Sequence, residues 1–541
     1  MDVRTSVPNL PDEETIENEA NSHTGLAKNF RVAKCERPRF ALFGIMFGII
    51  GFIYSFMRIL KDNYVMSRQE PICILYIKIF YIMPLSFIVV LLINYLLSRR
   101  TVSKLLSIFC FSFMILFFIL GGLVILEEKI MFKVDFTSIK IISSLIDRKG
   151  FGFLKYLILT INEPLATAVY VVAELWGSLI LSYLFLSFMN ETCTEKQHGR
   201  FIPPLFIIAN LSLLASALVT TLYFKIKDHL TPEQNTIFMG LIFFVQGFLV
   251  LGILFSKYIL ESKVITKPIF ISSNPRKGKG KTSIGFKEGI QIMLKSKFLL
   301  AMCSIVCIYS VNYNILETVY KNGIKAGAKA TDVEPGKYSG KYNNLDQYIT
   351  SLTVIFLNMS SFSNFVDKKG WVLVAMITPI ISIVTTLCII GLGTYNSSAE
   401  NKSISFTNSL FGGKTSYIVM ENLLGTLCLA ALKIFKYTAF DVTKERISMR
   451  IEDKYRPKFK SIFDGIFNKF GKSMGAFYGI AISSMLSDID IRGVSPITSI
   501  FIALFNFCWI WAVLYLGRSY NASIKANDNV DIDLTEPEKE K

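Results

Sequence analysis

One carboxylate lies inside a long apolar segment, where burying its charge costs free energy. Residues 166–190 form an apolar run that contains a single formal charge, Glu174. About 20 apolar residues suffice to cross a bilayer. Placing a carboxylate within hydrocarbon costs roughly 2.5–3.5 kcal/mol, so such residues face the interior of a bundle or a watery cavity. We therefore expect Glu174 to belong to a polar pathway or a binding site.

Other ionisable residues concentrate in three further apolar runs. The remaining runs have uncharged interiors, apart from Lys78 near the outer end of the second. The charges lie at the end of the first run, in the seventh and in the tenth: Arg58, Lys61, Asp62, Glu317, Lys321, Glu421, Lys433, Lys436, Asp441 and Lys444. Each has a structural alternative, since lysines and arginines near helix ends extend to the interface and a buried carboxylate can hold a structural hydrogen bond.

This mixture of signs suits a highly charged ligand. Polyphosphates need Lys or Arg, Lys acting as a mobile point charge and Arg as a planar fork. Carboxylates in the same cavity could pair with those cations when it is empty, carry protons, bind a base amine or exclude a wrong ligand. Nearby aromatic residues could stack on a flat base, although packing is the commoner role: Tyr64, Trp176, Tyr313, Tyr320 and Tyr437.

Several kinds of chemistry are excluded by composition. The three histidines look like tail or loop residues, which argues against a Ser-His-Asp triad and a membrane-embedded acyltransferase. Gly471-Lys472-Ser473 lacks the upstream glycine of a phosphate-binding loop, because position 466 is Ile. The nine cysteines have no spacing typical of a disulfide framework or a metal site, so we expect no metal and no cofactor. A scaffold or receptor role would not explain charges facing a cavity.

The elements that position these residues are membrane helices. The chain is 52% hydrophobic, which predicts an all-α polytopic membrane protein. We place twelve spans near 40–61, 74–97, 105–126, 166–190, 202–224, 236–258, 298–320, 346–366, 371–393, 415–438, 473–488 and 495–517. A short run at 151–161 is an interfacial helix or a lead-in to the fourth span.

The loop charges orient the spans. Positive clusters before the first span and after the second, sixth, eighth and tenth place both termini in the cytoplasm. These cytoplasmic clusters also account for much of the net charge of +17, so the charge does not require nucleic-acid binding. Sequons at Asn396 and Asn401 weakly support an outer loop between spans nine and ten.

The predicted organisation is two six-helix halves. It comprises a disordered cytoplasmic tail (1–38), an N-terminal half (39–260), a basic cytoplasmic loop (261–297), a C-terminal half (298–517) and an acidic cytoplasmic tail (518–541). Two such halves are typical of major-facilitator transporters. The charged spans one, four, seven and ten are the first and fourth of each half, which line the central cavity in that architecture.

Four ordered motifs resemble one family. Residues 58–62 read Arg-Ile-Leu-Lys-Asp, 173–178 Ala-Glu-Leu-Trp-Gly-Ser, 314–321 Asn-Ile-Leu-Glu-Thr-Val-Tyr-Lys and 436–445 Lys-Tyr-Thr-Ala-Phe-Asp-Val-Thr-Lys-Glu. They resemble motifs of the nucleotide transporter family, the ATP/ADP translocases of plastids and of obligate intracellular parasites and bacteria. Gly471-Lys472-Ser473 with Gly475 is similar to a further family motif, and the resemblance covers roughly 38–517.

The resemblance implies a secondary transporter that exchanges ATP for ADP by alternating access. The matching charged positions suggest that Lys61, Glu174, Glu317, and Lys436 or Lys444 matter for transport. Arg58, Asn314, Lys321 and Asp441 lie within the same motifs. We also expect the empty carrier to cross poorly because its cavity charges are unneutralised. Proton-linked net import of purine nucleotides remains the alternative.

Two departures bear on detail. Val442 stands where the family commonly has Pro, so the end of helix ten is expected to be less broken. The acid-rich N-terminus resembles neither a signal nor a transit peptide. This favours the surface membrane of an intracellular parasite, with a relict mitochondrion-like organelle as the alternative. ATP and ADP as substrates and the lipid bilayer are the implied partners, and the oligomeric state and the preference among nucleotides stay open.

Overall fold

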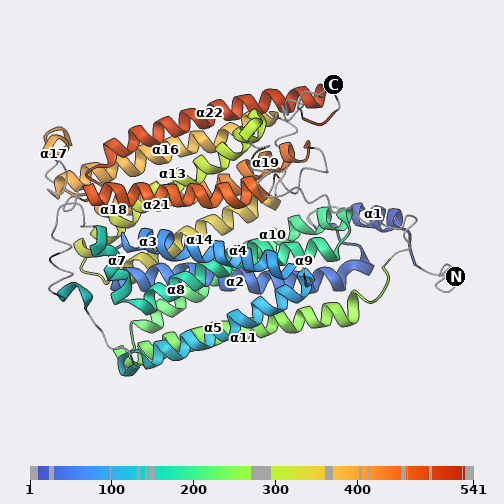
Figure 1. The fold of residues 1–541 in the computed structure, drawn as a ribbon, viewed down its shortest axis with the longest axis horizontal. Coiled ribbons are helices and arrows are strands. Elements are labelled where there is room, and N and C mark those ends of the chain that lie inside the picture. Colours follow the sequence, from blue (N-terminus) through green and yellow to red (C-terminus); the bar gives the residue numbers. More distant parts are fainter. Residues whose placement is uncertain are drawn as a thin grey trace. The chain divides into compact units, whose positions relative to one another are not determined.

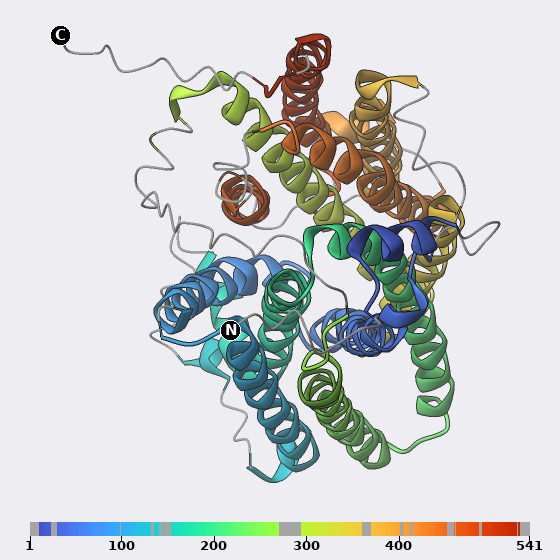
Figure 2. The ribbon, with the colours of Figure 1, turned by 90° about the vertical axis from the view of Figure 1, so that its right-hand side faces the viewer.

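The computed structural model is helical throughout its described part (Figures 1 and 2). The structure describes residues 10–22, 30–97, 99–130, 135–139, 144, 153–269, 291, 294–359, 369–400, 405–411, 415–451, 459, 461–485, 490–526 and 528–530. Within these ranges there is no β-strand, and nine helices are long and apolar enough to cross a membrane. This agrees with the predicted all-α polytopic membrane protein.

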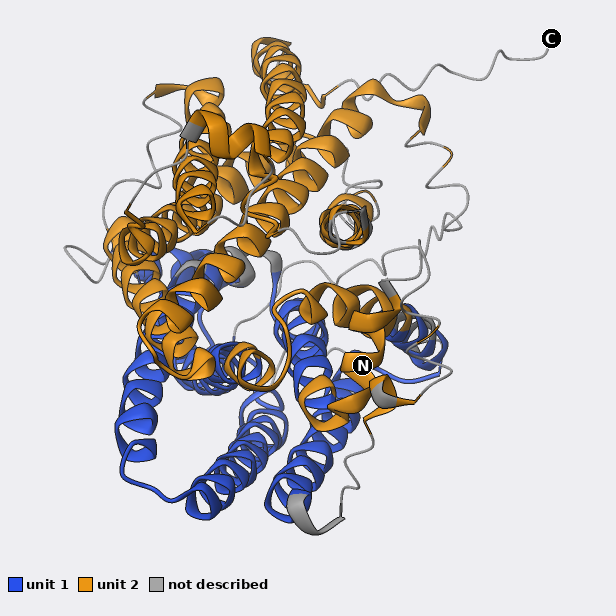
Figure 3. Cartoon of the chain, turned by 90° about the vertical axis from the view of Figure 1, so that its left-hand side faces the viewer, with its two compact units in different colours: residues 1–61, 85–132, 168–280 blue, residues 62–84, 133–167, 281–541 orange. Residues whose placement is uncertain are grey.

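The chain divides into two compact units, coloured separately in Figure 3. Unit 1 comprises 1–61, 85–132 and 168–280, and unit 2 comprises 62–84, 133–167 and 281–541. Three of the boundaries fall inside α2 (Arg37–Arg68), α4 (Met83–Leu97) and α8 (Pro164–Leu175). The predicted five-part division of the chain follows sequence order instead, and it stays a prediction.

Unit 1 contains α2 up to Lys61, α4 from Leu85 onward and α8 from Ala168 onward. Its other elements are α1 (Glu13–Asn21), η3 (Lys34–Glu36), α5 (Val102–Ile130), the π-helical turn η6 (Trp176–Leu184), α9 (Phe185–Thr192), α10 (Glu195–Lys227), α11 (Pro232–Ile259) and the π-helical turn η7 (Leu260–Val264).

Unit 2 holds the rest of α2, α4 and α8. Its other elements are α3 (Cys73–Tyr76), the π-helical turn η4 (Ile77–Ile82), η5 (Phe136–Ser138), α7 (Phe153–Asn162), α13 (Lys297–Ala330), α14 (Pro335–Met359), α16 (Trp371–Ala399), α17 (Ser405–Phe411), α18 (Ile418–Phe435), the π-helical turn η9 (Lys436–Phe440), α19 (Asp441–Ser448), the π-helical turn η10 (Ser461–Phe467), α21 (Asn468–Met485) and α22 (Ser495–Ala526).

Among the described residues, helices occur in each of the twelve predicted spans, with one informative shift. The eighth was predicted at 346–366, but α14 begins at Pro335. Its first turns are rich in Gly, Tyr, Asn and Lys, which hydropathy assigns to a loop, although Pro suits the first position of a helix. Helix ten runs through Val442 to Ser448 without a break, as its sequence predicts.

In unit 1, the core contains tightly packed aromatic rings and closely packed helices. Trp176 is fully buried, donates from Nε1 to the carbonyl of Ile50 at 3.2 Å and meets Phe113 edge-to-face at 5.3 Å between ring centroids. Its role is therefore packing. Helices α5 and α11 pack at Gly121 and Gly240, where a Cβ on either residue would lie within 2.9 Å of the other's carbonyl oxygen. Small residues permit this close contact between membrane helices.

In unit 2, α13 is the central helix and packs against α14, α16, α18, α21 and α22. A Cβ on Gly471 of α21 would lie 2.5 Å from the carbonyl oxygen of Cys307, and one on Gly475 would lie 2.8 Å from the Cβ of Asn314. These two glycines of the family-like motif therefore allow α21 to lie directly on α13.

The predicted N-terminal tail contains an ordered element. Helix α1 buries Ile16 and Ala20 against Ala33. Ile16 and Ala20 are four residues apart and therefore lie on the same face of the helix. This explains how a mostly polar segment can pack against the rest of the chain through one apolar face. Much of the predicted central loop (270–290) and of the C-terminal tail (531–541) lies outside the described residues.

Candidate functional site

Lys61 and Glu174, both in unit 1, form an ion pair. The Lys61 ammonium lies 2.7 Å from Glu174 Oε1 and 3.7 Å from the centroid of the Tyr170 ring. The Lys61 side chain is 7% exposed and that of Glu174 is 32% exposed. Lys61 therefore does not extend to an interface, whereas Glu174 is only partly buried. Arg58, one helical turn earlier on α2, is half-buried.

A chain of alternating charges runs through unit 2. Lys321 lies 3.0 Å from Asp62 and 3.5 Å from Glu317, and Glu317 also lies 3.2 Å from Lys78. Lys78 donates to the side-chain oxygen of Asn314 at 2.9 Å. The structure thus brings together the predicted residues Asn314, Glu317 and Lys321 and adds Lys78, whose place in the π-helical turn η4 the sequence did not reveal.

Helix ten carries a second chain of charges at its π-helical turn. Lys436 lies 2.7 Å from Asp441, which lies 3.3 Å from Lys444, and Lys444 lies 2.5 Å from Asp464 in η10. π-Helical turns are frequent at functional sites. Here such turns contain Lys436 and Asp464, which supports a role for this region beyond membrane anchoring.

The sequence analysis missed one ion pair. Asp346 of α14 and Lys433 of α18 lie 2.5 Å apart, and both are more than nine-tenths buried. The sequence named Lys433 among the charges of helix ten, with anchoring at the inner end of the helix as its alternative role. Asp346 was overlooked because the polar stretch before it hid the start of α14.

Arg492 is the centre of another buried cluster that sequence analysis missed. Its guanidinium lies 2.8 Å from Asp490, 2.9 Å from Glu400 and 3.3 Å from Glu421, and it is fully buried. Burial disfavours its charge, but the three carboxylates outweigh this and raise the pKa of Arg492 above its ordinary value. The cluster fixes the ends of α16 and α18 to the turn before α22.

The sequon at Asn396 belongs to the same cluster. Asn396 is fully buried, donates to Glu421 Oε2 at 2.8 Å and accepts from the backbone N–H of Tyr417 at 2.8 Å. Its use as evidence for a glycosylated outer loop is therefore wrong, because no glycan fits on a buried amide. Asn401 lies outside the described residues.

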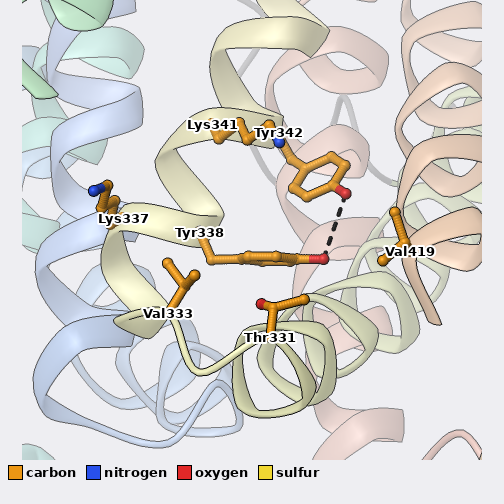
Figure 4. Close-up of a pocket in the computed structure, with 7 residues that line it drawn as sticks. All are labelled: Thr331, Val333, Lys337, Tyr338, Lys341, Tyr342 and Val419. Atoms are coloured by element: carbon orange, nitrogen blue, oxygen red, sulfur yellow. Dashed lines mark hydrogen bonds between the residues drawn. The ribbon is translucent and has the colours of Figure 1, made fainter. Parts of the chain in front are cut away.

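A small hollow in unit 2 lies away from the predicted site residues. Figure 4 shows Tyr338 and Tyr342 of α14 extending toward Val419 of α18, with their hydroxyl oxygens 3.4 Å apart. The hollow has a volume of about 330 Å³ and its lining is completed by Thr331, Val333, Lys337 and Lys341. It contains none of the nine residues predicted from the sequence.

The aromatic candidates differ in their surroundings. Tyr320 is buried and shares a 2.7 Å hydrogen bond with Thr426, whereas Tyr437 is 45% exposed and lies 4.5 Å from the Lys436 ammonium. Tyr64 is buried with Arg68 stacked 4.1 Å from its ring centroid. Of these three, Tyr437 alone is exposed.

The pairing distinguishes two expectations. The sequence led us to expect unneutralised charges in the empty carrier, but it also allowed carboxylates to pair with the cations of an empty cavity. In the structure, each lysine predicted at the site has a carboxylate within 3.0 Å, in agreement with the second expectation. Any phosphate that binds these lysines must therefore compete with a carboxylate.

Comparison with known proteins decides the family. The profile of the TLC ATP/ADP transporter family matches residues 17–520. The chain belongs to this family. It is 47% identical over 531 residues to ADP,ATP carrier protein 1 of Encephalitozoon cuniculi, covering 98% of this chain and 95% of that protein. It is 31% identical to ADP,ATP carrier protein 1 of Paranosema grylli, covering 97% and 96%, and 25% identical to ADP,ATP carrier protein 4 of Rickettsia bellii, covering 91% and 92%.

The TLC family assignment agrees with the fold. The crystal structure of a D-xylose-proton symporter aligns over 89% of this chain and 97% of its own, with a TM-score of 0.50 and 12% identity. This TLC family member is thus a multi-pass membrane transporter with a major-facilitator-like fold. The resemblance drawn from its four motifs is confirmed.

Proposed function

We propose that this protein exchanges ATP for ADP across a membrane by alternating access. The TLC family assignment and the relatives named ADP,ATP carrier proteins support this proposal. The observation that carries it at the level of the site is a set of lysines held by carboxylates, of which Lys61, Lys321 and Lys444 are buried and Lys436 is half-buried. Polyphosphates are the ligands whose charge can replace several carboxylates at once.

The ion pairs suggest a physical basis for obligatory exchange. In the empty protein, the ammonium of Lys61 has Glu174 as its partner, and Lys436 has Asp441. A nucleotide that arrives takes over the lysines and releases the carboxylates. When it leaves, the carboxylates close on the lysines again. We propose that the protein changes state only while the polyphosphate has replaced these ion pairs, so that exchange is obligatory.

We further propose how the chain sits in its membrane. The predicted halves 39–260 and 298–517 rock against each other about a central cavity, with both termini cytoplasmic. The surface membrane of an intracellular parasite is the proposed location, and a relict mitochondrion-like organelle is the second candidate. Import of ATP from a host cell against export of ADP fits the first location.

Transport by reconstituted vesicles tests the proposal. Vesicles preloaded with ADP should take up labelled ATP many times faster than empty vesicles, with no requirement for a pH gradient. Equal uptake by loaded and empty vesicles, or uptake that depends on a pH gradient without any counter-substrate, would replace exchange by net import. Competition by all common nucleotides in the same vesicles ranks the substrates.

A further inference from the structure

Helix α14 presents a buried polar face to its neighbours in unit 2. Tyr338, Tyr342, Asp346 and Thr350 recur at intervals of four residues, so they lie on one side of the helix, and all four are buried. The first two line the hollow of Figure 4. The face therefore runs from that hollow into the interior of the helix bundle.

Polar side chains of α13 and α18 lie next to this face of α14. The side-chain amide of Asn422 donates to the Tyr338 hydroxyl at 3.1 Å, and the hydroxyls of Tyr320 and Thr426 lie 2.7 Å apart. Further along α18, Lys433 reaches Asp346 at 2.5 Å. We call the residues Tyr338, Tyr342, Asp346, Thr350, Tyr320, Asn422, Thr426 and Lys433 the polar seam.

The seam retains unused hydrogen-bonding capacity. The Oγ1 of Thr350 and the Oδ1 of Asn422 are buried and find no hydrogen-bond partner among the described residues. Leaving a buried polar atom unsatisfied costs about 1–3 kcal/mol. Hydrophobic residues would serve a structural interface at least as well, because replacing a buried ion pair by apolar groups is often neutral or stabilising. A seam kept polar under these conditions suits a ligand.

Lys433 also lies close to the other predicted lysines of helix ten. It precedes Lys436 by one helical turn, and its ammonium lies 5.8 Å from the ring centroid of Tyr313, as that of Lys436 lies 5.9 Å from the centroid of Tyr309. The rings of Tyr309 and Tyr313 stack on each other, with centroids 6.1 Å apart. The two lysines thus lie along the same pair of aromatic rings on α13.

We propose that Lys433 binds the phosphate chain of the transported nucleotide and that Asp346 is the counter-ion that it leaves. Asp346 is then a positioning residue, because it sets how much negative charge a ligand needs in order to displace it from Lys433. Because ATP has one phosphate more than ADP, the pair makes the affinity depend on the length of the phosphate chain. This inference rests on the proposed exchange function.

The test compares affinities in vesicles preloaded with ADP. Competition by AMP, ADP and ATP against labelled ATP is measured for the original protein, Lys433→Gln, Asp346→Asn and the double variant. Lys433→Gln should weaken ATP binding by about tenfold or more, the scale of one charged hydrogen bond, and weaken ADP binding less. Asp346→Asn should strengthen ATP binding relative to ADP. The double variant should keep the lowered ratio of ATP to ADP affinity of Lys433→Gln, because Asp346 acts through Lys433.

A matched control and a charge-conserving variant keep the test decisive. Lys257 is 4% exposed and lies 2.8 Å from Glu261 in unit 1, outside the seam, so Lys257→Gln removes a comparable ion pair and should leave the affinity ratio unchanged. Lys433→Arg keeps the charge and covers the case in which Lys433→Gln does not fold. An unchanged ratio in all folded seam variants would overturn this inference alone. No nucleotide exchange by the original protein would overturn the proposed function itself.

Discussion

Removing the charge of Glu174 and removing the charge of Lys61 should change the affinity for the substrate in opposite directions. Glu174→Gln removes the carboxylate that competes with phosphate for Lys61. Measured couplings are about 0.2–1 kcal/mol for exposed pairs, and breaking buried pairs costs about 3–5 kcal/mol. This pair lies between these limits, with side chains 7% and 32% exposed. We assign the competition about 1–2 kcal/mol, so the KM for ATP should fall by about 5- to 30-fold.

The turnover of Glu174→Gln should fall together with its KM. Lys61 would hold the phosphate without a carboxylate to reclaim it, so the nucleotide leaves more slowly. Lys61→Gln has the reverse effect on affinity because it removes the phosphate ligand itself. A hydrogen bond to a charged group contributes about 1.5–3 kcal/mol, which predicts a KM raised by about 10- to 150-fold.

The assay is exchange of labelled ATP into vesicles preloaded with ADP, with rates divided by the amount of folded protein. The double variant Lys61→Gln/Glu174→Gln closes the cycle and measures the coupling between the two residues. A rise in KM for Glu174→Gln, parallel to that of Lys61→Gln, would refute the competition and indicate that Glu174 contacts the nucleotide directly. Unchanged exchange would remove Glu174 from the site.

Three further predictions concern stability, each measured as the half-life of the detergent-solubilised protein on heating. Arg492→Gln leaves three carboxylates buried without their cation and should cost about 3–5 kcal/mol, whereas Arg492→Lys keeps the charge and should cost less. Asn396→Asp places a second carboxylate against Glu421 in place of a donor and should cost about 1–3 kcal/mol, while Asn396 should carry no glycan in a glycosylating host. Gly471→Val forces α21 away from Cys307 of α13 and should cost about 1–3 kcal/mol, and stability equal to the original protein would refute that packing argument.

The sequence predicted which helices carry charge but not how the charges pair. Glu174 stood out because hydropathy makes an isolated carboxylate conspicuous within an apolar run, and the structure pairs it with Lys61. Helical spacing allows the contacts of Lys321 with Glu317 and of Lys444 with Asp441, but it gives no indication of their contacts with Asp62 and Asp464, which lie on other parts of the chain. Which carboxylate meets which lysine depends on tertiary packing.

The residues that sequence analysis missed share a cause. Asp346 follows a polar stretch that a hydropathy window assigns to a loop, although α14 is already helical there. Arg492 lies in the turn between two spans, where an arginine is unremarkable in sequence, yet its side chain is fully buried. Hydropathy registers charges inside apolar runs and gives no signal for those at the ends of helices.

The π-helical turn at Lys436–Phe440 also determines where helix ten can lose a single residue. A π turn holds about one residue more than a regular α-helical turn. Deleting one residue there would allow an ordinary helix to form, with an equally apolar span and sound insertion. A π turn and a regular turn each complete one rotation, so residues after the deletion would keep their orientation relative to those before it, and Lys444 would stay on the face that Asp464 occupies. The same deletion in a regular turn of helix ten would rotate the following residues by about 100°, since 3.6 residues complete a turn. The loss of one residue before Lys444 is therefore compatible with this arrangement of charges at the π turn but not elsewhere in the helix.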